Sequence, residues 1–159
     1  MKSYLLIFSL LLVGAGCTKS NTTAYHDKLA AAHEEMLQQV KVAEEHFHLF
    51  ESNKTDLLGL SNAVNAFNAF ADSIKLQVKS IEGPDKNALK IATIKYINGL
   101  KSVINKEFRN VAGIVIMSDE PLNRMENETT TSVIVKRTNA IEEAFQFQLN
   151  RFTHTYKKS

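Results

Sequence analysis

Hydrophobic residues recur every three or four positions along most of the chain. The clearest stretch is 57–81, where the pattern has no gap: Leu57, Leu60, Val64, Phe67, Ala71, Ile74, Val78 and Ile81. That spacing puts the apolar side chains on one face of an α-helix. The stretch 25–50 has the same spacing in Tyr25, Leu29, Ala32, Met36, Val40, Ala43, Phe47 and Phe50. Both stretches therefore predict long amphipathic helices.

Two further stretches complete the pattern. Over 86–117 a broad apolar face is made by Leu89, Ala92, Tyr96, Leu100, Val103, Ile104, Phe108, Val111, Ile114 and Val115. The β-branched run 111–117 would also suit a strand, but the helical period enters it unbroken and a lone strand would have no partner. The last stripe follows three threonines, which are poor helix formers, and consists of Ile134, Thr138, Ile141, Phe145, Leu149, Phe152 and Tyr156.

Short polar breaks separate the four stretches. They are Ser52-Asn53-Lys54, Gly83-Pro84-Asp85, and the polar run from Ser118 to Thr131. The last run either forms a loop or begins the fourth helix early, since Asn123 and Glu126 have the spacing of a capping box. Four amphipathic helices with such connections predict an all-α, up-down-up-down antiparallel four-helix bundle. We expect a single domain over 24–159.

The first seventeen residues have a different pattern. Lys2 is followed by the apolar run 4–13, by three small residues and then by Cys17, the only cysteine of the chain. A run of this length is too short to span a bilayer and is typical of a signal peptide. In an exported protein a single thiol has no internal disulfide to form.

The sequence Gly14-Ala15-Gly16-Cys17 resembles the lipobox of bacterial lipoproteins. The resemblance implies cleavage of the signal peptide 1–16 between Gly16 and Cys17, attachment of fatty acyl chains such as palmitate to Cys17, and a partner membrane. The polar residues 17–23 then form a tether to the domain. An ordinary secretory signal that contains a cysteine is the alternative.

Charge is balanced overall but unevenly distributed. Lys plus Arg number 19 against 17 Asp plus Glu, which gives no reason to expect nucleic-acid binding. The first predicted helix is acidic, and the third is basic through Lys86, Lys90, Lys95, Lys101, Lys106 and Arg109. Diagonal helices would give the rod an acidic and a basic side. These sides are either a partner surface or simply solvated faces.

The sequence offers little chemistry for an active site. Glu45-x-x-His48 has the spacing of one half of a di-iron site, but the second copy is missing, since Glu143 is followed by Gln146. We therefore predict no metal and no cofactor. The chain has no Gly-x-Ser-x-Gly motif and no phosphate-binding glycine loop, so we predict that it is not an enzyme.

For four polar residues near the apolar stripes we expect structural roles. His33 lies at the edge of the first stripe, where a histidine is usually hydrogen-bonded inside the bundle. Glu107 lies next to the third stripe, and we expect it at the surface, although an inward carboxylate with a raised pKa is the alternative. Asn65 and Asn68 have the positions to bond across the surface.

The mature chain resembles a family of small lipoproteins of bacteroidete-like bacteria and spirochaetes. The matching residues are the lipobox, Tyr25-x-Asp27-Lys28, Asp85, Ala88-Leu89-Lys90, Tyr96, Glu107-Phe108, Pro121-Leu122, Ala144 and Phe152. The family has no established activity, so the resemblance implies only fold and location. Thr18 after the cysteine favours the outer membrane, with the domain facing the periplasm.

These observations predict a lipid-anchored, non-enzymatic protein of the cell envelope. Its helical rod would bind another envelope protein or another part of the envelope through an exposed helix face. A ligand- or metal-binding bundle is the alternative. The sequence does not specify the oligomeric state.

Overall fold

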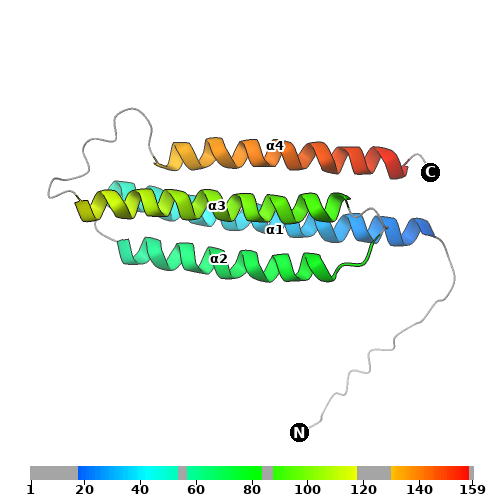
Figure 1. Cartoon of the computed structure of the whole chain (residues 1–159), viewed down its shortest axis with the longest axis horizontal. Coiled ribbons are helices and arrows are strands. Elements are labelled where there is room, and N and C mark those ends of the chain that lie inside the picture. The colour runs from blue at the N-terminus through cyan, green and yellow to red at the C-terminus, as the bar shows by residue number, and fades with distance from the viewer. Residues whose placement is uncertain (1–17, 54–56, 84–87, 118–129, 158–159) are drawn as a thin grey trace, which may run out of the picture.

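The protein is an all-α four-helix bundle. The computed structural model describes residues 18–53, 57–83, 88–117 and 130–157, and its helices are α1 (Thr18–Asn53), α2 (Leu57–Ser80), α3 (Ala88–Met117) and α4 (Thr130–Lys157). Successive helices run antiparallel and form an elongated rod (Figure 1). The predictions for 1–16, Cys17, Asp85 and the Asn123–Glu126 box lie outside the described residues.

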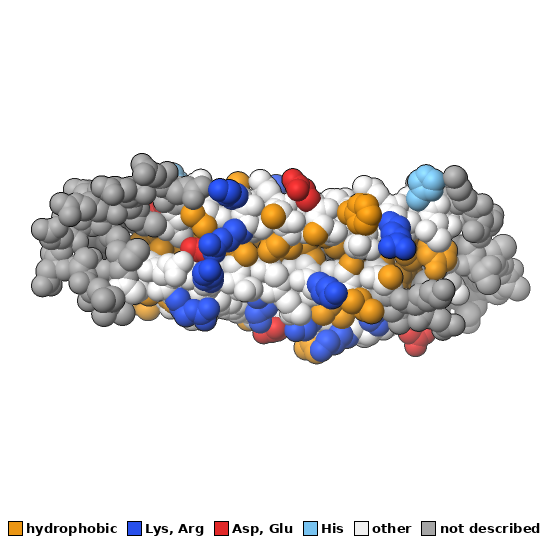
Figure 2. Space-filling model, turned by 45° about the horizontal axis from the view of Figure 1, so that its top comes forward, with side chains coloured by type: hydrophobic (Ala, Val, Ile, Leu, Met, Phe, Trp, Pro, Cys, Tyr) orange, Lys and Arg blue, Asp and Glu red, His pale blue; other side chains and the backbone are white. Residues whose placement is uncertain are grey.

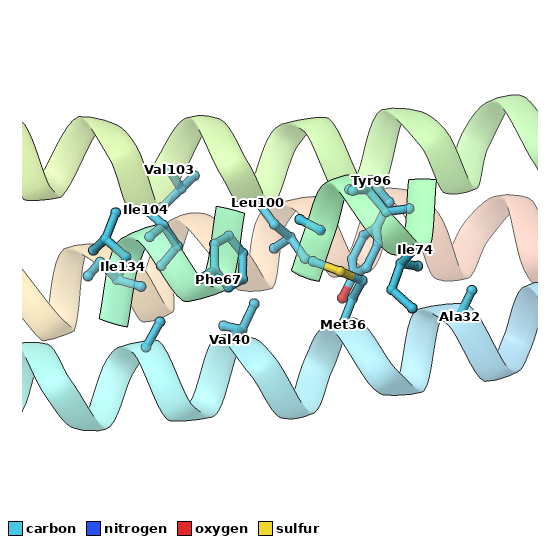
Figure 3. Close-up of a cluster of buried hydrophobic side chains, with 14 of the residues drawn as sticks. Ala32, Met36, Val40, Phe67, Ile74, Tyr96, Leu100, Val103, Ile104 and Ile134 are labelled. Atoms are coloured by element: carbon cyan, nitrogen blue, oxygen red, sulfur yellow. The ribbon is translucent and has the colours of Figure 1, made fainter. Parts of the chain in front are cut away.

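The hydrophobic core follows the predicted stripes. On α2 the buried residues are Leu60, Val64, Phe67, Ala71, Ile74 and Val78, six of the eight predicted. Leu57 and Ile81, at the ends of the stripe, pack against the core but stay partly exposed. Figure 3 shows side chains of all four helices meeting in the middle of the bundle. The stripe on α4 is buried less completely, and Tyr156 at its end is exposed.

The helices do not form a square. Each helix contacts its neighbours around the bundle, and α1 also contacts the diagonal α3, whereas α2 and α4 share no contact within the described residues. The cross-section is therefore a rhombus with α1 and α3 on its short diagonal. The diagonal placement predicted for the acidic and the basic helix is confirmed.

Helix α1 begins earlier than its apolar pattern. Residues 18–23, expected to be an irregular tether, are helical, although none of residues 21–24, where the described burial of this helix begins, is buried before Tyr25. Adding a residue to an existing helix costs little compared with starting one. The buried turns from Tyr25 onward therefore allow the polar residues before them to continue the helix.

The hydroxyl of Tyr25 supports the start of α3. It accepts a hydrogen bond from the backbone N–H of Lys90 at 3.2 Å, in the helix turn whose N–H groups have no partner within the helix. The Lys90 ammonium in turn donates to two carbonyls at the end of α2, that of Lys79 in the last turn at 2.6 Å and that of Ile81 just after the helix at 2.8 Å. A Cβ on Gly83 would lie 2.1 Å from the Tyr25 ring, so this close approach requires glycine.

The carboxylate of Glu51 performs the same function for α4. It accepts hydrogen bonds from the backbone N–H of Thr131 at 3.1 Å and from its hydroxyl at 2.7 Å. A negative charge at a helix N-terminus is favourable because the free N–H groups there carry partial positive charge. This cap explains how α4 begins within a run of threonines.

Candidate functional site

A groove runs along the surface between α3 and α4. Its volume is about 650 Å³, and its lining is mainly apolar, with small side chains on both helices: Ala88, Ile91, Ala92, Lys95, Tyr96, Gly99, Ala140, Ile141, Ala144, Phe145 and Gln148. Small-molecule and peptide sites in proteins are commonly concave, apolar and of this size. We therefore take the groove as the centre of the candidate site.

The small residues create the groove. Ala140 and Ala144 on α4 face Ala88, Ala92 and Gly99 on α3, so little side-chain volume fills the seam between the helices. At Gly99 the two helices approach each other closely, because a Cβ there would lie 3.2 Å from the Ile141 side chain. The groove is thus a consequence of residue size.

Exposed residues on both sides of the groove form two strips, which together we call the basic–apolar face. The α3 strip is Ile91, Lys95, Ser102, Lys106 and Arg109, and the α4 strip is Lys136, Ala140, Ala144, Phe147 and Arg151. Within each strip the spacings of 3, 4 and 7 keep the side chains on one side of the helix. Figure 2 shows this face, with Lys and Arg around a band of hydrophobic side chains.

The two large hydrophobic residues of this face are well exposed. Phe147 is 65% exposed and Ile91 is 52% exposed. Single exposed hydrophobic residues are common, but here they flank an apolar groove, and grouped apolar surface often marks an interaction site.

Acidic residues concentrate on the other side of the rod. The described burial of α1 shows four exposed carboxylates against two exposed lysines: Asp27, Glu34, Glu35 and Glu45 against Lys28 and Lys41. On α3 no carboxylate is exposed within its described part, because Glu107 is buried. Among the described residues of α4 one carboxylate is exposed, that of Glu143. The separation of charge expected from the sequence is thus present at the surface.

Under the floor of the groove lies a small polar cluster. Nε2 of the buried His33 on α1 is 2.8 Å from both carboxylate oxygens of Glu142 on α4. The imidazole stacks on Phe145, with ring centroids 4.6 Å apart, and tilts against Tyr96 at 5.0 Å. The prediction that His33 is hydrogen-bonded inside the bundle is confirmed.

The hydroxyl of Tyr96 is the odd member of this cluster. It is buried and has no hydrogen-bond partner within the described residues. Burial raises the pKa of Tyr96 well above 10, and the negative charge of Glu142 raises it further. Figure 3 shows the hydroxyl on the side of Met36 of α1, so it is not directed into the groove. The hydroxyl therefore offers no polar contact to a molecule in the groove.

The ion pair predicts a pH-dependent stability. Burial would raise the pKa of Glu142, but hydrogen bonds from Gln146 and His33 and the charge of His33 outweigh it and lower the pKa below 4.5. A carboxyl with a lowered folded-state pKa stabilises the fold above its unfolded-state pKa, and the contribution disappears as the pH falls through the folded-state pKa. We expect Glu142→Gln to cost about 1 kcal/mol at pH 7.

Chemical denaturation at several pH values measures this difference. The gap between wild type and Glu142→Gln should close as the pH is lowered from 4.5, the ordinary pKa of the carboxyl. Glu143→Gln is the matched control, because Glu143 is exposed, and it should show little effect at any pH. A gap that stays constant down to the acid limit of folding would exclude the proposed role of the charge.

Glu107 is the main correction to the sequence analysis. It is only 4% exposed, not at the surface as expected. Its carboxylate accepts hydrogen bonds from the Arg137 guanidinium on α4 and, at 2.9 Å, from the Asn110 amide. Glu107 continues the core spacing of Leu100, Ile104 and Val111. This position, together with a basic residue on the next helix, could have predicted from the sequence that Glu107 is buried.

The other residues considered for chemistry remain apart. Glu45 and His48 are both exposed, and within the described ranges no three His, Cys, Asp or Glu side chains come together as a metal site. Asn68 does bond to another helix, in a reciprocal amide pair with Asn105 at 2.8 Å in each direction. Asn65 is exposed. No ligand set or catalytic group forms from these residues.

No protein-family model, curated protein or solved structure matches the chain. The resemblance to small bacterial lipoproteins therefore stays a prediction. Of the helices in the described residues, none has the length and apolar character to span a bilayer.

Proposed function

We propose that this protein is a lipid-anchored, non-enzymatic protein of the cell envelope that binds an envelope component through its basic–apolar face. The observation that carries the proposal is the combination, on one side of the rod, of an apolar groove with exposed basic residues of both helices. Such a surface suits a partner that presents apolar groups and negative charge together.

The proposed anchor is Cys17. It directly precedes the first helical residue, Thr18, and the lipobox-like sequence before it supports cleavage at this point. A lipid on Cys17 would hold the rod at the membrane. If the cell has two membranes, the proposed anchor lies in the outer membrane and the domain faces the periplasm. The binding face would then meet its partner at the bilayer rather than in free solution.

Intact mass and membrane fractionation of the full chain, expressed in its host beside Cys17→Ala, test the anchor. We expect a lipid-sized mass increase and sedimentation with membranes after a high-salt wash, and loss of both in the variant. The wash removes protein held only by charge. A soluble, unmodified protein cut near Gly16 or Cys17 would refute the anchor.

The second candidate function is binding of a small apolar ligand. It is favoured by the volume of the groove, about 650 Å³, which lies within the range of ligand sites. A native mass spectrum of the same host-expressed protein distinguishes the two functions. A retained non-covalent ligand would favour the ligand-binding function, and a mass accounted for by chain and lipid alone would favour the binding of an envelope component.

A further inference from the structure

We propose that the basic–apolar face binds the surface of an anionic phospholipid bilayer, so that the rod lies along the membrane. This inference rests on the proposed function and names the envelope component as the lipid bilayer itself. It follows from the distribution of charge, the exposed hydrophobic residues, the length of the face and the position of Cys17.

The distribution of charge determines which side of the rod faces the bilayer. Lys95, Lys106 and Arg109 on α3 and Lys136 and Arg151 on α4 are all exposed, with Glu143 as the one exposed carboxylate beside them in the described parts of both helices. The exposed carboxylates of α1 lie across the short diagonal from α3. Near an anionic bilayer the basic side is attracted and the acidic side is repelled, so both effects favour the same orientation.

The exposed hydrophobic residues lie where this orientation needs them. Phe147 and Ile91 belong to the same two strips as the basic residues. Surfaces that bind at the boundary between lipid headgroups and acyl chains combine lysine or arginine with large hydrophobic side chains. Phe147 and Ile91 would enter this boundary while the basic side chains contact phosphate groups.

The length of the face favours contact along the rod. Ile91 and Arg109 are 18 positions apart on α3, which corresponds to about 27 Å at the rise of an α-helix. On α4, Lys136 and Arg151 are 15 positions apart, or about 22 Å. Each helix carries basic residues on both sides of small residues, with Gly99 between Lys95 and Lys106 on α3 and Ala140 and Ala144 between Lys136 and Arg151 on α4.

The position of Cys17 is compatible with this orientation. With α3 and α4 on the bilayer, α1 lies roughly one helix spacing farther away, about 10 Å. Six polar residues, Thr18–Thr23, lie between Cys17 and the part of α1 that belongs to the core from Tyr25 onward, and in extended form they span up to about 20 Å. This length exceeds one helix spacing, so a lipid on Cys17 can reach the membrane.

Anchor and face would strengthen each other. A lipid anchor keeps the face close to the bilayer, and the second contact then forms at a high local concentration. A basic surface beside a lipid chain is a general means of making membrane attachment stable. The face would thus fix the orientation of a rod whose anchor alone leaves it free to turn.

Vesicle sedimentation tests the inference without the lipid. The probe is residues 17–159 with Cys17→Ser, mixed with vesicles of phosphatidylcholine alone or with phosphatidylglycerol added. We expect binding to the anionic vesicles, weakened by salt, and little binding to the neutral ones. A basic residue near an anionic surface contributes roughly fivefold in affinity, so K106E/R109E should weaken binding at least about 25-fold.

The matched control is K28E/K41E, which changes the net charge equally on exposed positions of α1 and should leave binding unchanged. Phe147→Ala should weaken binding without a change in charge.

The proposal is wrong if the protein does not bind anionic vesicles, or if the two charge reversals weaken binding equally. It is also wrong if the protein does not bind vesicles but can be crosslinked to an envelope protein, and K106E/R109E abolishes that crosslink. This outcome would identify a protein partner. Because the probe has no lipid, failure here leaves the test of Cys17 unaffected.

Discussion

Phe67→Ala should reduce the free energy of unfolding by about 4 kcal/mol, the largest effect expected for a single core substitution in this bundle. Phe67 on α2 is 2% exposed. Figure 3 shows its ring directed into the bundle, between Val40 of α1 and Leu100 of α3. Because these neighbours belong to separate helices, they cannot close the space without moving whole helices. The loss therefore combines the transfer of the ring to water with a cavity that remains.

Urea denaturation followed by circular dichroism measures this change, with Phe147→Ala as the control. The control removes the same atoms from an exposed position on α4 and should change the stability by less than about 0.5 kcal/mol. Similar losses for both variants would mean that Phe67 is not enclosed by α1 and α3 as described.

The core of this bundle is predictable from sequence because burial follows spacing. The apolar stripe of α2 has no interruption, and its interior residues are the buried ones. The run 111–117 is helical, as the continuous period predicted. In both cases a single rule, the three- and four-residue step, determines the structure, and no other residue has to be known.

Features that depend on a second helix are harder to predict. The Glu51 carboxylate caps the start of α4, and the Tyr25 hydroxyl accepts a hydrogen bond from the first turn of α3. Both partners come from α1, far away in the sequence. The groove has the same origin, because it results from small residues on α3 that meet small residues on α4. A periodic pattern gives the direction of a side chain but not the size of what faces it.

Glu107 shows this limit most clearly and leads to the second large effect. Its spacing places it in the core, while its charge suggests the surface, and Arg137 of α4 reconciles the two. Arg137→Met should cost about 3 kcal/mol, since among the described residues it leaves the buried carboxylate with the Asn110 amide as its one hydrogen-bond partner. Glu107→Leu should cost less, because Arg137 is 40% exposed and its guanidinium can turn to water.

The double variant R137M/E107L separates loss of the pair from loss of packing. Replacing both members by apolar residues removes the stranded charge, so the double variant should be more stable than Arg137→Met alone. Arg151→Met, at an exposed position of α4, controls for the substitution itself and should have little effect. If Arg137→Met and the double variant prove equally destabilised, the cost lies in helix packing and not in the charge of Glu107. Recovery in the double variant would show that Arg137 is needed in this bundle because Glu107 is buried.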